Sequence, residues 1–360
     1  MKVIPPLAIT TAMVNETYSN VKETVPTAWS GATTYTFTGE SVSVASTNNY
    51  YNCYEAVQVP NLNHAVTDTA WWRFTGVAYG AYAAGTTYAL NDRVSVLSTH
   101  NVYQSLVGSN LGNAVTDTTK WALVGKTNLW QLFDYDSNGK CISGPNGSIT
   151  FTMEPASRID AIAMTGVIAD SFNISVIDNA TVTEVYNKTI NLNDREAVGW
   201  YEFFFAPFTY KRSFALFDLP PVSSSQIIIA ITSTTTTDIS AESLVIGKQV
   251  YIGDVQYGCE SDAINYSTIT RDFAGDISTI TKRRNVTKTA STLQVDKGYV
   301  DAIINLRYTT NAYAAIWSGL NDDITDAYFS SMLILGFARR FTINNTYPNN
   351  AIINLEIEEL

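Results

Sequence analysis

The sequence predicts a mainly β protein, in which two small tandem β modules precede a jelly-roll-like β-sandwich and a mixed α/β C-terminal part. Three observations support this prediction. A segment of roughly fifty residues occurs twice, alternating apolar and polar runs follow it, and only 15% of the 360 residues are charged while Thr, Asn and Ser are abundant. Thr fits a pleated strand, and Asn and Ser compete with helical hydrogen bonds, so this composition favours sheets and turns over helices.

Residues 1–28 are predicted to form an extended N-terminal arm. Pro5, Pro6 and Pro26 fix the backbone φ angle and lack an N–H donor, which disfavours helices and central strands. Only Lys2 precedes a short apolar run that Thr residues interrupt, so this start does not resemble a signal peptide. No later run reaches the length of a membrane span, and we expect a protein that is made in a cytoplasm.

The duplicated segment predicts two equivalent small β modules, at 29–76 and 77–126. The copies share five features in the same order: a Thr-Thr-Tyr, a Val-Ser-Val strand, a central Tyr, the pentapeptide Ala-Val-Thr-Asp-Thr and a closing Trp. In the first copy these features lie at 33–35, 42–44, Tyr54, 65–69 and Trp72. In the second copy they lie at 86–88, 94–96, Tyr103, 114–118 and Trp121. The copies differ in length near 48–52, which places the insertion in a loop. Such a period is typical of repeated modules with two or three short strands each.

Longer strands are predicted in the third part of the chain, 127–255. Residues 148–153, 172–177 and 182–186 alternate between apolar and polar, whereas 201–205 and 227–231 are continuous apolar runs that predict strands buried on both faces. Asn, Asp and Pro turn signals separate them. Strands of this length and spacing favour an antiparallel sandwich, most simply a jelly roll.

The last part, 256–360, is predicted to mix helix and strand and to pack on the sandwich. Apolar residues at helical spacing predict one amphipathic helix near 296–310. Strands are predicted over 332–337, 341–343 and 351–357, the last of them running to the end of the chain. A chain that finishes as a strand is usually tied into a sheet.

Charge and cysteine usage exclude several classes of protein. The net charge of −11 disfavours a nucleic-acid partner, because phosphates would be repelled. The one basic cluster, Lys282-Arg283-Arg284, is interpreted as a solvated loop or a subunit contact. Cys53, Cys141 and Cys259 are widely spaced, so free thiols are expected rather than a disulfide framework or a zinc site. No cofactor is predicted.

Catalytic motifs are missing from the sequence, so no enzyme is predicted. A hydrolytic triad needs a histidine held by an acid, and only His64 and His100 occur. His100 is predicted to lie in a surface loop over 98–101. Walker, nucleophile-elbow and zincin motifs do not occur. A carboxylate pair for glycoside cleavage stays open, because its spacing is a property of the fold.

One segment fits the first half of a calcium-binding loop. Asp134, Asp136 and Asn138 stand at alternate positions before Gly139, as oxygen ligands of a hard cation would. The twelfth position, however, is Pro145 rather than a bidentate Glu. We therefore interpret the segment as a tight Asn-Gly turn and predict no metal.

Aromatic residues in the two copies are the candidate ligand-binding residues, since sugar rings stack on such side chains. The carbohydrate-binding candidates are Tyr54, Trp71, Trp72, Tyr103 and Trp121, with His100 in the adjacent loop. For Trp72 and Trp121 the alternative is a place in the core of a very small domain. Trp71 is replaced by Lys120 in the second copy, which predicts an exposed position.

Each copy resembles the small chitin-binding-type carbohydrate-binding modules of glycosidases and phage tail proteins. This resemblance implies an aromatic platform at Tyr35, Tyr54 and Trp72 in one copy and at Tyr88, Tyr103 and Trp121 in the other.

A second resemblance covers most of the chain. Motifs recur in order at 127–134, 200–207, 219–221, 252–258, 265–267, 317–319, 335–337 and 355–360. Together they resemble a family of uncharacterised virion proteins encoded among the tail genes of tailed bacteriophages. Asn265 and Glu359 depart from the residues that are usual in that family.

The resemblance implies a non-enzymatic structural protein of the phage virion, in the tail, the tail tip or the attachment point of fibres. Its implied partners are other virion proteins, further copies of itself and host surface glycan. A polysaccharide depolymerase, or a collar or capsid decoration protein without sugar binding, is the alternative.

Overall fold

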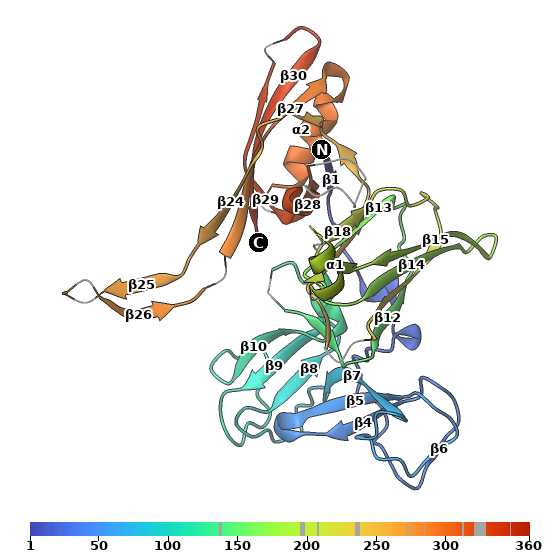
Figure 1. The fold of residues 1–360 in the computed structure, drawn as a ribbon. Helices are drawn as coiled ribbons and strands as arrows, with labels where there is room; N and C mark the ends of the chain where they lie inside the picture. Colours follow the sequence, from blue (N-terminus) through green and yellow to red (C-terminus); the bar gives the residue numbers. More distant parts are fainter. Residues whose placement is uncertain are drawn as a thin grey trace.

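The computed structural model has a mainly β fold with several antiparallel sheets, which confirms the predicted class. It describes residues 1–136, 139–194, 199–206, 209–234, 238–271, 273–274, 276–283, 285–311, 313–319, 329–345 and 347–360. Figure 1 shows the sheets arranged in sequence along the molecule. The duplicated segments lie at one end, the 127–255 part lies in the middle, and a C-terminal sheet with a projecting hairpin lies at the other end.

The two copies of the duplicated segment form two three-stranded antiparallel sheets. The first has the order β4 (Ser41–Ala45), β5 (Tyr50–Ala56), β7 (Trp72–Tyr79), and the second has the order β8 (Arg93–Val96), β9 (Asn101–Ser105), β10 (Trp121–Lys126). A small pair, β3 (Thr34–Tyr35) with β6 (Asn61–Leu62), closes the first copy. Each sheet has a bulge before a glycine with positive φ, Gly76 at +125° and Gly125 at +152°, a conformation that side chains disfavour.

The middle part contains two sheets around a shared core. A five-stranded sheet has the order β15 (Thr183–Asn191), β14 (Ser171–Asp178), β19 (Ser225–Thr232), β12 (Ser148–Met153), β2 (Val14–Asn15), and a three-stranded sheet has the order β18 (Phe214–Leu216), β13 (Ala161–Thr165), β21 (Ser243–Gly247). A pair joins β11 (Cys141–Ser143) to β20 (Ile239–Ala241). Large buried side chains such as Phe151, Phe172 and Phe214 fill the core.

The predicted strands at 148–153, 172–177 and 227–231 are confirmed, and 182–186 lies in β15 except for Val182. The 227–231 run is buried only at alternate residues, so it is not covered on both faces. The strand predicted over 201–205 is wrong, because these residues form helix α1 (Trp200–Phe205) and are not buried. An apolar run by itself does not separate a strand from a helix, since tertiary packing decides between them.

The C-terminal part forms an eight-stranded sheet. Its order is β22 (Val250–Tyr251), β1 (Lys2–Ile4), β28 (Ala315–Ser318), β29 (Leu333–Asn344), β30 (Asn350–Glu359) and β27 (Asn285–Asp296), with β23 (Asp254–Val255) and β24 (Glu260–Asn265) both paired to β27. The predicted helix is confirmed as α2 (Val300–Thr309), preceded by η5 (Lys297–Tyr299). The predicted strands lie in β29 and β30, except for Met332, which ends a 3-10 turn. Ile303 and Leu306 of α2 are buried in the core of this sheet.

The N-terminal arm is built into two of these sheets. β1 lies between β22 and β28, where Val3 and Ile4 are fully buried, and β2 adds to the edge of the five-stranded sheet beside β12. Residues 1–28 therefore link the C-terminal sheet to the middle part.

Beyond β24 and β27, the hairpin continues outward as β25 (Thr268–Arg271) and β26 (Ile277–Thr281), which project away from the body of the molecule (Figure 1). The remaining short elements are η1 (Thr11–Met13), η2 (Glu16–Tyr18), η3 (Thr47–Asn49), η4 (Leu129–Phe133), η6 (Ser330–Met332), β16 (Asn193–Asp194) and β17 (Thr209–Tyr210).

Candidate functional site

Two of the aromatic candidates, Trp72 and Trp121, lie in the cores of their copies. They are 1% and 2% exposed. Trp72 packs edge-on against Tyr35 with ring centroids 4.9 Å apart, and Trp121 packs against Tyr88 at 5.3 Å. These positions match the core alternative for the two tryptophans, and buried rings offer no face for a sugar.

Tyr54 and Tyr103 are half-buried and occupy equivalent places. Each lies opposite the first valine of the Val-Ser-Val strand, Val42 or Val94. Each ring packs on the core of its own copy, and the Tyr103 hydroxyl accepts a hydrogen bond of 3.3 Å from Asn101 Nδ2. The two tyrosine rings therefore contribute mainly to the cores of their copies rather than to a continuous aromatic platform.

Trp71 packs partly against the core of its copy and stacks on a second ring. Its ring stacks on the His64 imidazole with centroids 3.8 Å apart and planes 11° apart, and His64 Nδ1 lies 3.5 Å from Asp68 Oδ2. The predicted exposure is met only in part, because Trp71 is half-buried. The second copy has Asn113 and Lys120 at these two places, so the stack belongs to the first copy alone.

The first copy also carries exposed apolar side chains. Phe37 is more than half exposed and Leu62 is half exposed. Leu62 lies opposite Thr34 in the small β3–β6 pair. An aromatic ring beside a carboxylate can hold the C–H face of a sugar ring and accept hydrogen bonds from its hydroxyl groups.

The prediction that His100 lies in a surface loop is wrong. The residue is 7% exposed and its ring stacks on Trp130 with centroids 3.6 Å apart. Its Nδ1 lies 2.7 Å from Glu23 Oε1, and its Nε2 lies 2.8 Å from Thr11 Oγ1. Glu23 Oε1 also accepts a 2.8 Å hydrogen bond from Thr127 Oγ1. The N-terminal arm folds over this loop, and sequence patterns do not report such a long-range contact.

The His100 contacts have the hydroxyl–imidazole–carboxylate order that hydrolases use. When Nδ1–H donates its hydrogen bond to Glu23, Nε2 is the acceptor for the Thr11 hydroxyl. Thr11 is exposed and lines a cavity of about 730 Å³, whose other lining residues include Pro6, Ile9, Trp130, Phe133 and Tyr313. In structural terms, the network fastens the arm to the second copy and to η4.

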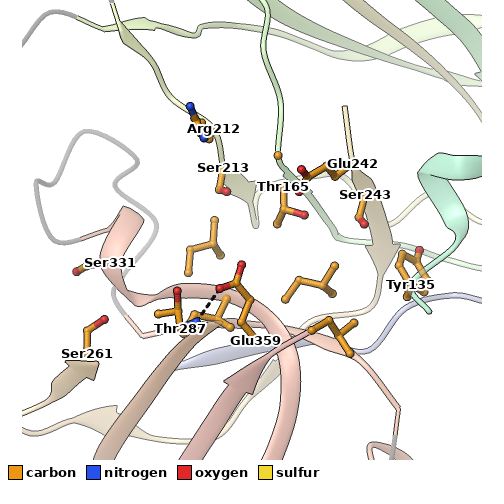
Figure 2. Close-up of a pocket in the computed structure, with 15 residues that line it drawn as sticks. Tyr135, Thr165, Arg212, Ser213, Glu242, Ser243, Ser261, Thr287, Ser331 and Glu359 are labelled. Carbon is orange, nitrogen blue, oxygen red and sulfur yellow. Dashed lines mark hydrogen bonds between the residues drawn. The ribbon is translucent and has the colours of Figure 1, made fainter. Parts of the chain in front are cut away.

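A second, more polar cavity of about 500 Å³ lies between the middle part and the C-terminal sheet (Figure 2). Glu242, Glu359 and Arg212 contribute charges to its lining. Glu359 Oε2 accepts a 2.8 Å hydrogen bond from the Thr287 N–H, and Lys140 Nζ lies 2.8 Å from Glu242 Oε1. Carboxylates from the β20–β21 connection and from the end of β30 thus line one cavity.

The calcium-loop candidates do not form a metal site among the described residues. Asn138 lies outside them. Between Asp134 and Asp136, the Tyr135 hydroxyl donates a 2.8 Å hydrogen bond to the Leu244 carbonyl, and burial raises the pKa of Tyr135. In the part of the chain that the structure describes, no three His, Cys, Asp or Glu side chains gather where they could hold a metal ion. All three cysteines are free thiols, as predicted.

The aromatic surface that sequence reasoning missed is α1. Trp200 is 80% exposed, and Tyr201, Phe204 and Phe205 are also more exposed than buried. The run of aromatic residues carries a signal, but an apolar run fits a buried strand as well as an exposed helix.

No model of a known protein family matches this chain, and a search of curated proteins finds no relative. Within the described residues, no helix is both long and apolar enough to cross a membrane.

Proposed function

We propose that this protein is a non-enzymatic structural protein of a tailed bacteriophage virion, at the tail, the tail tip or the attachment point of fibres. In this proposal, 29–76 and 77–126 are tandem carbohydrate-binding-like modules, 127–255 is a jelly-roll-like sandwich, and 256–360 is a mixed α/β region packed on it. The ordered motif resemblance along most of the chain supports the virion role.

The observation that carries the glycan contact is the His64–Trp71 stack. It lies on the first copy, at the end of the molecule opposite the C-terminal sheet (Figure 1). We infer that the C-terminal sheet anchors the protein to other virion subunits while the duplicated end points outward. A weak contact per module gains strength when many copies act on one particle.

The location of the protein is tested first. Purified virions are labelled with an antibody against residues 29–125 and imaged by negative-stain electron microscopy. Label at the far end of the tail is expected. Label at the neck or on the capsid would overturn host recognition and favour a collar or decoration protein.

The stack itself is tested by substitution in the assembled particle. We expect Trp71→Ala to weaken adsorption to host cells by roughly two- to tenfold, because one aromatic contact is worth about 0.5–1.5 kcal/mol. Lys120→Ala, at the equivalent place in the second copy, is the matched control and is expected to adsorb normally. Unchanged adsorption of the Trp71 variant would show that the modules act as spacers.

A second candidate function, a polysaccharide depolymerase, is favoured by the carboxylates of the polar cavity in Figure 2. Glycoside cleavage uses one carboxyl group as an acid and a second as a base or nucleophile. The test is whether purified protein lowers the viscosity of host capsule or lipopolysaccharide. A loss of viscosity that both Glu242→Gln and Glu359→Gln abolish would establish the enzyme and overturn the non-enzymatic proposal.

A further inference from the structure

One face of the C-terminal sheet carries polar side chains that lie close together. Leu293 and Val295 of β27 are buried in the core that this sheet shares with α2. Gln294 and Asp296 alternate with them, so these two exposed side chains project from the opposite face of the sheet. Asp254 of β23 is the cross-strand partner of Gln294, and such partners share a face. This face is therefore polar where its reverse is apolar.

Two adjoining cavities, of about 320 and 330 Å³, are lined by these side chains. Gln256 and Gln294 line both cavities. Tyr251 and Tyr299 line the first cavity, and Tyr347 lines the second. Because they share residues, the cavities form one continuous groove. We name it the amide groove and define it by Tyr251, Gln256, Gln294, Tyr299, Tyr347 and Asn350.

The amide side chains of the groove form one hydrogen-bonded chain. Gln256 Nε2 donates to Gln294 Oε1 over 3.3 Å. With the Asn350 amide oriented so that its oxygen faces a donor, this oxygen accepts from Gln294 Nε2 over 2.8 Å. The Asn350 nitrogen then donates to Asp296 Oδ1 over 3.1 Å. A side-chain amide has two N–H donors and two acceptor positions, so Gln256 and Gln294 keep oriented positions for further hydrogen bonds.

Three tyrosines with exposed rings border the amide groove. Tyr299 is 49% exposed and packs edge-on against Tyr251, with ring centroids 5.6 Å apart and planes 77° apart. The Tyr251 hydroxyl donates a 2.7 Å hydrogen bond to Asp254 Oδ1, which holds that ring in place. Tyr347 is 58% exposed beside the second cavity. The groove therefore presents apolar rings and oriented hydrogen-bonding groups side by side.

The charge of the groove restricts the ligand that it can bind. Asp254 and Asp296 line it, whereas the described lining residues include no Lys or Arg. A phosphorylated or acidic ligand would face like charges and be repelled. A neutral sugar fits better, because its C–H face packs on an aromatic ring and its hydroxyl groups hydrogen-bond to amides and carboxylates.

We propose that the amide groove binds a neutral oligosaccharide, which packs a sugar ring on Tyr299 and hydrogen-bonds to Gln256 and Gln294. The groove lies at the end of β27 and β30 away from the projecting hairpin, so the hairpin end of the sheet stays free for the virion contacts proposed above (Figure 1). The groove shares no residue with the His64–Trp71 stack. Either glycan proposal can therefore fail alone.

Affinity electrophoresis of the purified full-length chain tests the proposal. Each native gel contains one soluble polysaccharide: dextran, galactomannan, xyloglucan or hydroxyethyl cellulose as a neutral probe, or alginate as the acidic probe. We expect at least one neutral probe to retard the chain and alginate to leave its mobility unchanged. Retardation by none of the neutral probes, or retardation by alginate as strong as by the best neutral probe, would overturn the proposal.

Variants assign the retardation to the groove. Tyr299→Ala is expected to weaken binding by roughly two- to tenfold, and Gln294→Ala by a similar factor. Tyr308→Ala is the matched control, because Tyr308 is 71% exposed on α2 and does not line the groove. Unchanged binding in both groove variants would overturn the proposal. Loss of binding in Trp71→Ala alone would also overturn it, while supporting the glycan contact of the first copy.

Discussion

The two copies of the duplicated segment share a core but differ in what their hairpin tips contact. In both copies the buried indole N–H donates to the carbonyl eight residues earlier, over 2.8 Å from Trp72 to His64 and over 3.0 Å from Trp121 to Asn113. In both, the tip residue has a left-handed backbone, at Asn49 in the first copy and at His100 in the second. The cores of the two copies are therefore built in the same way.

The tips show where the copies have diverged. Asn49 Nδ2 donates a 2.9 Å hydrogen bond to the Arg93 carbonyl of the second copy, whereas His100 contacts Glu23, Thr11 and Trp130. The first tip thus contacts the copy that follows it, whereas the second contacts both the N-terminal arm and the part that follows it. The comparison teaches that core residues set the fold of a copy, and that tip residues set how it joins its neighbours.

The largest expected effect tests whether the cores are equivalent. Trp72→Ala and Trp121→Ala are each expected to lower the free energy of unfolding of their copy by about 3–5 kcal/mol, because a large buried ring leaves a cavity. Guanidinium denaturation followed by circular dichroism measures the loss. Trp71→Ala is the control, because the neighbouring ring is half-buried and its removal leaves no closed cavity. A loss below about 1 kcal/mol in either core variant would contradict the shared-core interpretation.

The second prediction tests the difference between the tips of the two copies. His100→Ala is expected to cost about 1.5–3 kcal/mol, because it leaves the buried Glu23 carboxylate without one hydrogen-bond partner, whereas Asn49→Ala is expected to cost about 1 kcal/mol. Combining His100→Ala with Glu23→Gln gives a double-mutant cycle that isolates the coupling between the two side chains. A coupling near zero would mean that His100 contributes only through its stack on Trp130.

The third prediction concerns Glu55, whose equivalent in the second copy is the neutral Gln104. Burial raises the pKa of Glu55 above its ordinary value of 4.5, although Arg73 lies 3.5 Å away and opposes the shift. The native state therefore binds this proton more tightly than the unfolded state does, and the stability that the group contributes is lost as the pH rises from about 4.5 through the raised pKa.

Glu55→Gln is accordingly expected to remove part of this loss of stability with rising pH, and to raise the stability of the first copy at pH 7. Denaturation across a pH series measures both effects. Gln104→Glu in the second copy is the reverse variant, and it is expected to introduce a similar fall. If the stability of Glu55→Gln changed with pH as steeply as that of the wild type, the prediction would be contradicted.

The smallest expected effect is a change in the rate of cysteine labelling, which distinguishes the first copy from the second. Burial raises the pKa of Cys53 to about 12, so its thiol is unreactive at pH 8, whereas the half-exposed Cys259 is expected to react with iodoacetamide first. The second copy has Val102 at the equivalent position, so Cys53 reports on the first copy alone. Trp72→Ala is expected to speed Cys53 labelling and Trp121→Ala to leave it unchanged; equal acceleration by both would mean that the copies open together.

Local patterns in the sequence were sufficient for much of the fold. The alternating runs at 148–153 and 351–357, and the helical spacing near α2, gave the correct elements because each depends on which face of a short segment is apolar. The duplicated Trp positions were also informative, but sequence left their role open between core and ligand contact, because a buried ring and a binding ring look alike in a sequence.

The sequence by itself determined that the protein is mainly β, that a segment is repeated, and where most strands of the middle and C-terminal parts lie. Only the tertiary structure decided that the 1–28 arm enters two sheets, that His100 is buried, and that the aromatic run at α1 is an exposed helix. The physical reason is that these features depend on contacts between residues far apart in the chain, such as Glu23 with His100 and Val3 with Trp317. Burial by a distant segment leaves no periodic signal in the segment that it covers.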